Sequence, residues 1–180
     1  MENQESREQG RSAIGAVGRG IAAGLVGTAL MTAWQELAAS LKRHAMVSMP
    51  REDEDPWKRA PAPAQLAKRV LEGAFGIEVP ASKIPFFTNA VHWGYGTGMG
   101  TVYGLAQSTR RTKASVGGPA FGAGVWAMSY ATLVPLGLYE WPWKYSVKTI
   151  AKDVSYHLVY GAGTAAGYEL AARLSRRSRA

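Results

Sequence analysis

The distribution of charge limits the fold of this chain more than any other feature. Between residues 84 and 109 the only charged or imidazole side chain is His92, and residues 114–139 contain none. Residues 20–41 contain one such side chain and residues 154–172 contain two. Each of these four segments is close to or longer than the roughly 20 residues with which an α-helix crosses a bilayer. The sequence therefore predicts helices that span a membrane.

We predict an all-α fold, an integral-membrane four-helix bundle that occupies residues 13–175. A polar tail at residues 1–12, predicted to be disordered, precedes the bundle, and a basic tail at 176–180 follows it. Pro135 should kink or end the third span. The predicted spans are residues 14–39, 86–108, 115–139 and 153–175.

The loop at residues 42–84, between the first two spans, contains a predicted amphipathic helix at 64–76. Its apolar residues recur at helical spacing on one face. Pro63 suits the first turn of this helix, and Gly76 suits its C-terminal end. The helix either packs on the bundle or lies in the membrane interface.

Two of the predicted spans share a sequence pattern at an offset of 65 residues. The residues that coincide include His92 with His157, Tyr95 with Tyr160, Gly96 with Gly161 and Tyr103 with Tyr168. A weaker likeness matches Gly27 and Met31 of the first span to Gly124 and Met128 of the third. We therefore expect two helical-hairpin repeats that run parallel and are related by an axis along the membrane normal.

Glycines spaced by four residues recur in all four predicted spans. In lipid, small residues at this spacing let two helices approach closely, so that dispersion contacts hold them together. The sequence predicts that such glycines lie at helix interfaces. The predicted packing residues are Gly96, Gly100, Gly104, Gly163 and Gly167.

The candidate functional residues are two histidines, their neighbouring tyrosines and one glutamate, namely His92, His157, Tyr95, Tyr160 and Glu36. Both histidines lie about one turn inside the outer ends of their spans, and Glu36 approaches the same surface. Ionisable residues inside a membrane are functional candidates because they are costly to place there. Arg19 and Glu169, near the opposite surface, are expected to form a structural ion pair.

Four interpretations of the histidine pair remain open. The imidazoles can be structural and bond a neighbouring tyrosine or carbonyl. With Glu36 they can bind or relay protons, because imidazole titrates near physiological pH. His92 and His157 can also ligate a metal or haem iron, one from each helix. Finally, the outer loops can dock a partner while the histidines have no direct role.

Composition excludes several classes of function. The chain has no cysteine, which excludes disulfides, thiolate metal sites and cysteine catalysis. Its net charge of +8 comes from basic residues that flank the apolar segments, and no nucleic-acid-binding motif accompanies them. We find no nucleophile motif, phosphate-binding loop or zinc-protease signature, so an enzyme is not expected. The expected partners are the lipid bilayer and a membrane-protein partner or a second copy of the chain.

The basic residues favour one orientation in the membrane. More of them lie on the side that holds both ends of the chain than on the side of the loop at 42–84. The positive-inside rule therefore predicts that both termini are cytoplasmic. The Trp-Pro-Trp sequence at 141–143 then lies on the outer side, where aromatic residues anchor a protein at the headgroup level.

The second half of the chain resembles the YagU-type family of small bacterial inner-membrane proteins. The likeness rests on three stretches, Trp126–Tyr130 leading to Leu133–Leu138, then Pro142 with Trp143, and Asp153–Leu158 at the start of the last span. The resemblance implies a multi-pass protein of the bacterial inner membrane, and it implies no catalytic residues. We expect a non-enzymatic accessory or transport-like protein that responds to protons or ions. The alternatives are a haem- or metal-binding bundle and a structural subunit of a larger membrane complex.

Overall fold

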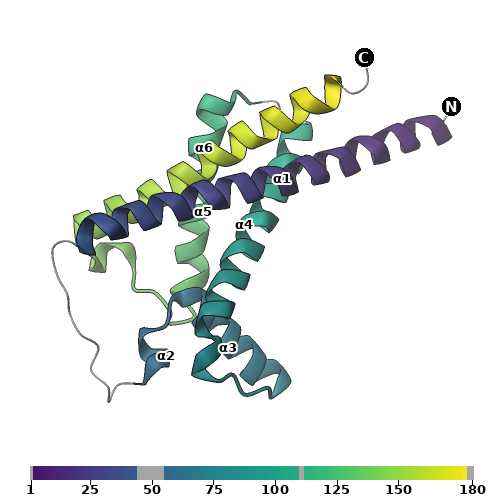
Figure 1. Ribbon diagram of the computed structural model, residues 1–180. Coiled ribbons are helices and arrows are strands. Elements are labelled where there is room, and N and C mark those ends of the chain that lie inside the picture. The colour runs from purple at the N-terminus through teal and green to yellow at the C-terminus, as the bar shows by residue number, and fades with distance from the viewer. Residues whose placement is uncertain (1, 44–54, 110–111, 178–180) are drawn as a thin grey trace.

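The computed structural model describes residues 2–43, 55–109 and 112–177, and in this part of the chain all regular structure is helical (Figure 1). The long helices are α1 (Glu2–Arg43), α4 (Ile84–Thr109), α5 (Ala114–Leu133) and α6 (Val147–Arg177). The short ones are α2 (Pro56–Arg59), α3 (Ala62–Phe75) and the 3-10 turns η1 (Ala81–Lys83) and η2 (Pro142–Lys144). The predicted all-α class is confirmed.

The four long helices form two crossed pairs. Helices α1 and α6 lie side by side and cross over α4 and α5 (Figure 1). Helix α1 packs on both α4 and α6, α5 packs on α6, and α3 packs on α4. Among the described residues α4 and α5 have little backbone contact. Their side chains meet where the ring of Tyr103 on α4 packs on that of Phe121 on α5, with centroids 5.0 Å apart. The gap between α4 and α5 is therefore the open side of the bundle.

The interface between α1 and α4 is built from glycines on both helices. A Cβ on Gly20 would lie 2.7 Å from the carbonyl oxygen of Gly100, and one on Gly24 would lie 2.7 Å from that of Gly96. A Cβ on Gly104 would lie 2.5 Å from the carbonyl oxygen of Ala16. Because no side chain fits at these points, the two backbones touch directly.

Helix α6 uses glycines against both of its neighbours. On the side of α5, a Cβ on Gly118 would lie 2.9 Å from the carbonyl oxygen of Gly161. On the side of α1, a Cβ on Gly163 would lie 2.8 Å from Leu30, and one on Gly167 would lie 3.1 Å from Val26. The five glycines expected at helix interfaces all lie at such interfaces.

The weak likeness between the first and third predicted spans does not extend to packing. A Cβ on Gly27 would lie 2.7 Å from the carbonyl oxygen of Tyr160, whereas one on Gly124 would meet nothing within 4 Å. Met31 is buried at 8% exposure, whereas Met128 is 53% exposed. The residues that correspond in packing are Gly24 and Gly118. Gly24 of α1 contacts the backbone of α4 at Gly96, and Gly118 of α5 contacts the backbone of α6 at Gly161.

The buried core consists mostly of small side chains, with Met31 and three tyrosines among them, and many large apolar side chains are exposed. No leucine, isoleucine, phenylalanine or tryptophan of the described residues is buried. Helix α1 carries several exposed apolar side chains, among them Leu25, Leu30, Trp34, Leu37 and Leu41. Proteins in water bury such residues. Small residues inside and large apolar residues outside are typical of helices that associate in lipid.

Several predicted boundaries differ from the structure. The tail at 1–12, predicted to be disordered, is helical from Glu2, because no proline interrupts this segment and α1 continues through it. The predicted spans at 86–108 and 115–139 correspond to α4 and α5, and α5 ends at Leu133, ahead of Pro135 and of Gly137 with its φ of 63°. Helix α6 begins at Val147, before the predicted 153, because Val147–Lys152 continues the helix without a breaker.

Among the described residues, one helical stretch, Ala13–Leu41, is long and apolar enough to cross a membrane by length and composition. Four such stretches were predicted. Helices α4 and α5 are both poor in charge, but α4 is rich in glycine, threonine and tyrosine and α5 is rich in glycine, and these residues add little to mean hydropathy. Low charge and high hydropathy are thus separate properties, and the sequence prediction relied on the first.

The predicted amphipathic helix at 64–76 corresponds to α3. Pro63 lies in its first turn, and Gly76 ends it in the left-handed conformation with a φ of 65°. An ion pair from Lys68 to Glu72 runs along the helix, and Glu72 also accepts the backbone N–H of Val79 at 3.1 Å. The helix packs on α4, but Val70 and Phe75 of its apolar face are exposed, so its place in a membrane interface stays a prediction.

Candidate functional site

A cavity of about 620 Å³ is lined by α4 and α5, which have little backbone contact with each other. Helices α1 and α6 line it as well, and the start of α3 lines it with residues such as Pro61 and Leu66. Arg69 of α3 donates a hydrogen bond to the carbonyl oxygen of Leu136, just beyond α5. Helix α3 therefore reaches across from α4 to the α5 side of the cavity.

All five candidate functional residues line this cavity, namely Glu36 from α1, His92 and Tyr95 from α4, and His157 and Tyr160 from α6. They come from helices that are far apart in sequence. The two histidines of the repeated pattern thus share one space rather than facing separate surroundings.

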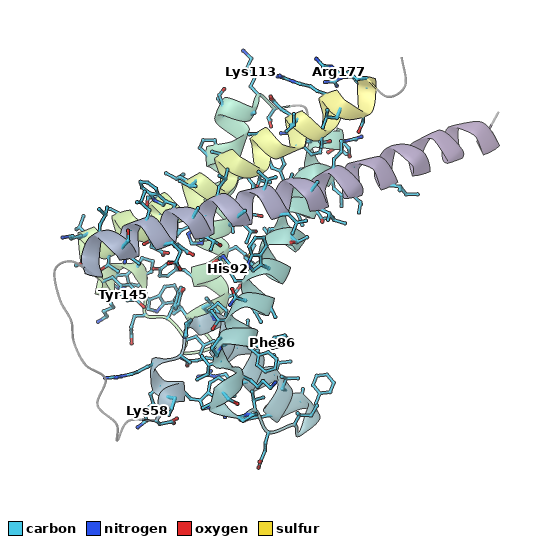
Figure 2. The ribbon with its side chains drawn as sticks, in the orientation of Figure 1. Lys58, Phe86, His92, Lys113, Tyr145 and Arg177 are labelled. Carbon is cyan, nitrogen blue, oxygen red and sulfur yellow. The ribbon has the colours of Figure 1, made fainter. Side chains whose placement is uncertain are left out.

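His92 faces α1 from the middle of the cavity wall. Its Nε2 lies 3.3 Å from the hydroxyl oxygen of Thr32. Figure 2 places His92 on α4, above Phe86 and near the point where α1 crosses. The hydroxyl can donate to or accept from the imidazole, so this contact is compatible with either neutral tautomer.

His157 lies beside Asp153, one turn earlier on α6. The Nδ1 atom of His157 lies 2.9 Å from the carbonyl oxygen of Asp153 and 3.7 Å from its carboxylate Oδ1. An N–H at Nδ1 donates to that carbonyl, and this bond directs the Nε2 atom away from the helix backbone. The histidine is thus oriented by its own helix.

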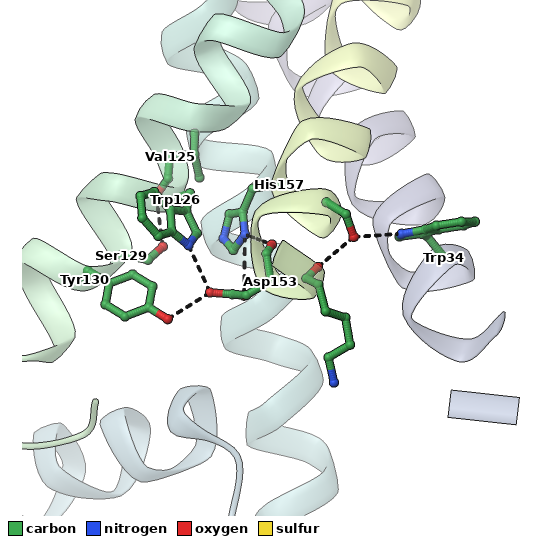
Figure 3. A network of polar contacts seen from close by, with 9 residues as sticks. Trp34, Val125, Trp126, Ser129, Tyr130, Asp153 and His157 are labelled. Carbon is green, nitrogen blue, oxygen red and sulfur yellow. Dashed lines mark hydrogen bonds and ion pairs between the residues drawn. The ribbon is translucent and has the colours of Figure 1, made fainter. Parts of the chain in front are cut away.

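The carboxylate of Asp153 is held by two donors from α5 (Figure 3). Trp126 Nε1 and Tyr130 OH each donate to Oδ2 at 3.0 Å. Hydrogen bonds to a carboxylate are among the stronger ones in proteins, and these two tie α5 to α6 beside the cavity. On the other side of α6, Trp34 of α1 donates to the hydroxyl of Ser155 at 3.1 Å.

Tyr160 lines the cavity and is the largest fully buried side chain of the described residues, with 2% exposure. Its hydroxyl donates to the carbonyl oxygen of Gly96 at 2.6 Å and so joins α6 to α4. Its ring lies 6.1 Å from that of Phe121 on α5. Tyr95, which occupies the corresponding place in the repeated pattern, is 43% exposed.

The ion pair expected between Arg19 and Glu169 does not form. Glu169 pairs instead with Arg173, one turn later on α6, at 3.4 Å on the surface. The guanidinium of Arg19 lies over the ring of Tyr168, 5.6 Å from its centroid. A cation over an aromatic face is attracted by the ring, so Arg19 has another partner at this position.

Asp153 was the functional candidate that sequence reasoning missed, together with Trp126 and Tyr130, which bind it. Asp153 marked the start of the last predicted span and was therefore treated as a boundary residue. Its spacing of four from His157 places both on one helix face, and that signal was available in the sequence. The partners on α5 could not be identified, because their approach depends on helix packing.

The described residues offer limited means of holding a metal ion. They include no group of three histidine, cysteine, aspartate or glutamate side chains arranged to bind one. The cavity can offer two imidazoles and the carboxylates of Glu36 and Asp153, and Oδ2 of Asp153 is already shared between two donors. The lining is better supplied with hydroxyls and tyrosine rings than with metal ligands.

Comparison with known proteins gives no match to a family model, to a curated protein or to a solved structure. The resemblance to the YagU-type family therefore gains no support from these comparisons, and the site has to be interpreted from its own geometry.

Proposed function

We propose that this chain is a multi-span membrane protein with a non-enzymatic, proton-responsive role, and that the cavity between α4 and α5 is its working site. The observation that carries this proposal is that His92 and His157 line one cavity, with Asp153 beside the second histidine. Imidazole is the side chain whose charge changes near physiological pH. An imidazolium at His157 would lie within reach of the Asp153 carboxylate.

The distribution of apolar side chains supports the proposed placement in a membrane. Large apolar side chains cover the outside, while glycines, alanines and threonines fill the helix interfaces. We propose that α1, α4, α5 and α6 all cross the bilayer, although only the stretch in α1 has high mean hydropathy. The protein would lie in the inner membrane of a bacterium with both termini in the cytoplasm.

The proposed repeat explains where the cavity forms. If α1 with α4 and α5 with α6 are related hairpins, the contact of α1 with α6 should have a counterpart between α5 and α4. Helix α1 does pack on α6, but α4 and α5 remain apart and leave the cavity between them. The cavity would thus form where the contact between α4 and α5, the counterpart of the contact between α1 and α6, is missing.

The test is the pH response of the protein in lipid nanodiscs, followed by tryptophan fluorescence. Trp126 reports on the site because it is bonded to Asp153. The wild type should show a transition in the range where imidazoles titrate, and the double variant His92→Gln/His157→Gln should lose it. A matched control is His44→Gln, which changes the third histidine and should keep the transition. A response that survives in the double variant would remove the proposal of a proton-responsive site.

A haem- or metal-binding bundle is the second candidate, because the two histidines meet at one cavity. The bond from His157 Nδ1 to the Asp153 carbonyl leaves Nε2 for a ligand, as is common for metal-binding histidines. The absorption spectrum and metal content of the purified protein decide this. A haem absorption band that disappears in His157→Gln would favour this candidate over the first, whereas a colourless, metal-free protein would argue against it.

A further inference from the structure

We propose that the cavity binds a small organic cation, such as a quaternary or protonated amine. This inference rests on the proposed function of the cavity and adds the chemical class of its ligand. It starts from the charges of the lining. The described residues that line the cavity include two carboxylates, Glu36 and Asp153, and no lysine or arginine. A space lined by two carboxylates, with no lysine or arginine beside its two imidazoles, favours positive ligands as long as the imidazoles are neutral.

The aromatic part of the lining is the second observation. Three tyrosine side chains, Tyr95, Tyr139 and Tyr160, contribute to the wall. The ring centroid of Tyr139 lies 5.2 Å from that of Tyr130, whose hydroxyl binds Asp153, so the Tyr139 ring lies close to this carboxylate. The faces of aromatic rings attract cations, and quaternary ammonium groups are recognised by such rings in combination with carboxylates.

The geometry at Asp153 leaves one carboxylate oxygen for such a ligand. Trp126 and Tyr130 both bond Oδ2, whereas Oδ1 has its nearest basic neighbour in His157, at 3.7 Å. The Nδ1 atom of His157 makes its shorter contact with the backbone carbonyl of Asp153, not with the carboxylate. Oδ1 can therefore face a positive group in the cavity.

The size of the cavity favours an organic cation over a bare metal ion. A volume of about 620 Å³ lies within the range of small-molecule sites. Met31, Leu66 and Val125 contribute apolar surface beside the polar groups, which suits the methyl and methylene groups of an alkylammonium ion. The described residues also lack a group of three metal ligands.

The experiment compares choline with dimethylbutanol, its neutral carbon isostere, by calorimetry and by melting of the full chain in detergent at neutral pH. Tetraethylammonium and tetrapropylammonium test larger cations in the same cavity. We expect choline to bind at least about tenfold more tightly than the isostere, because only choline gains from the carboxylate and the ring faces. Asp153→Asn should remove this preference while it keeps an acceptor for Trp126 and Tyr130. Glu169→Gln, which changes a surface carboxylate paired with Arg173, should leave it intact.

A second variant tests the same site if Asp153→Asn does not fold. Tyr139→Leu should weaken choline several-fold and leave the isostere unchanged, because it removes a ring from the wall. Equal binding of choline and its isostere by the wild type would overturn the inference, as would the absence of binding by all the ammonium ions. Either result leaves the proposed function standing if the histidine-dependent pH response persists. Loss of that response as well would remove both.

Discussion

At the scale of single residues, corresponding residues of the two copies of the repeated pattern differ in burial and in hydrogen-bond partners. Tyr160 is buried and bonds Gly96 across the interface between α6 and α4, whereas the corresponding Tyr95 is nearly half exposed. His157 is oriented by Asp153, and His92 by Thr32 on a different helix. The sequence pattern identifies which residues reach the cavity, but the partners decide what each of them contributes.

Tyr160→Phe should destabilise the protein by about 1 kcal/mol, because it removes a buried hydrogen bond and leaves the volume of the ring unchanged. Tyr95→Phe is the matched control and should have almost no effect, since Tyr95 is exposed. Thermal unfolding of both variants in the same detergent measures the difference. Equal melting of the two variants would mean that the bond from Tyr160 to Gly96 does not contribute to stability.

Glu72 provides a pH-dependent contact on α3. The hydrogen bond from Lys68, and then that from the Val79 N–H, lower the pKa of Glu72 below its ordinary value of 4.5. Because the pKa is lower in the folded state, this contribution to stability is present above the ordinary pKa. It is lost as the pH falls through the lowered value.

The chemical shift of the Val79 amide should therefore titrate with a midpoint below 4.5, because this N–H donates to the Glu72 carboxylate. In Glu72→Gln the same amide should show no such step. A midpoint at or above the ordinary value, or a step that persists in the variant, would show that this contact does not form in solution.

At the scale of helices, glycine patterns locate the interfaces but do not give their register. The spacing of Gly96, Gly100 and Gly104 predicted a packed face, and that face meets Gly20 and Gly24 of α1. Which glycines meet could not be predicted, because every pair spaced by four offers the same short-range pattern. The attempted match of Gly27 with Gly124 shows this, since the structure packs one and leaves the other open.

Much of the candidate site was nevertheless predictable from sequence. Rare imidazoles in apolar segments indicated His92 and His157, and helical periodicity indicated their tyrosines. The cavity itself was not predictable, because it depends on the angle between α4 and α5. The role of Asp153 was missed for a related reason, since Trp126 and Tyr130 approach it from another helix.

The packing of α1 on α4 gives a prediction with a built-in control. Gly100→Ala should destabilise the protein by about 1–3 kcal/mol, because the new Cβ collides with the backbone of Gly24. Gly98→Ala, on the open side of the same helix, meets nothing within 4 Å and should be neutral or slightly stabilising, since alanine favours helix. Melting in detergent compares the two. If Gly100→Ala melts at or above the temperature of Gly98→Ala, the two helices do not pack as described.

At the scale of the whole molecule, basic residues lie at both ends of the helices, and a pair of exposed tryptophans lies at one of them. Lys113 at the start of α5 and Arg177 at the end of α6 lie at one end, and Lys58 and Tyr145 lie toward the other (Figure 2). At that other end the stacked rings of Trp141 and Trp143 are exposed, with centroids 4.9 Å apart. In the proposed membrane arrangement these exposed tryptophans would lie at the headgroup level, where aromatic residues are enriched.

An arrangement with four membrane spans and one with a single span differ in where they place Lys144 and Ser175, which lie near the two ends of α6. If all four long helices cross the membrane, these positions lie on opposite sides; if only α1 crosses, both lie on the same side. Because the chain has no cysteine, Lys144→Cys and Ser175→Cys each give a single reactive site. With a maleimide that does not cross membranes, we expect Ser175→Cys to react only in inverted vesicles and Lys144→Cys only in right-side-out vesicles. Both should react after detergent is added, which controls for buried thiols. Reaction of both from one side would contradict the four-span arrangement, and opposite labelling with the sides exchanged would reverse the orientation alone.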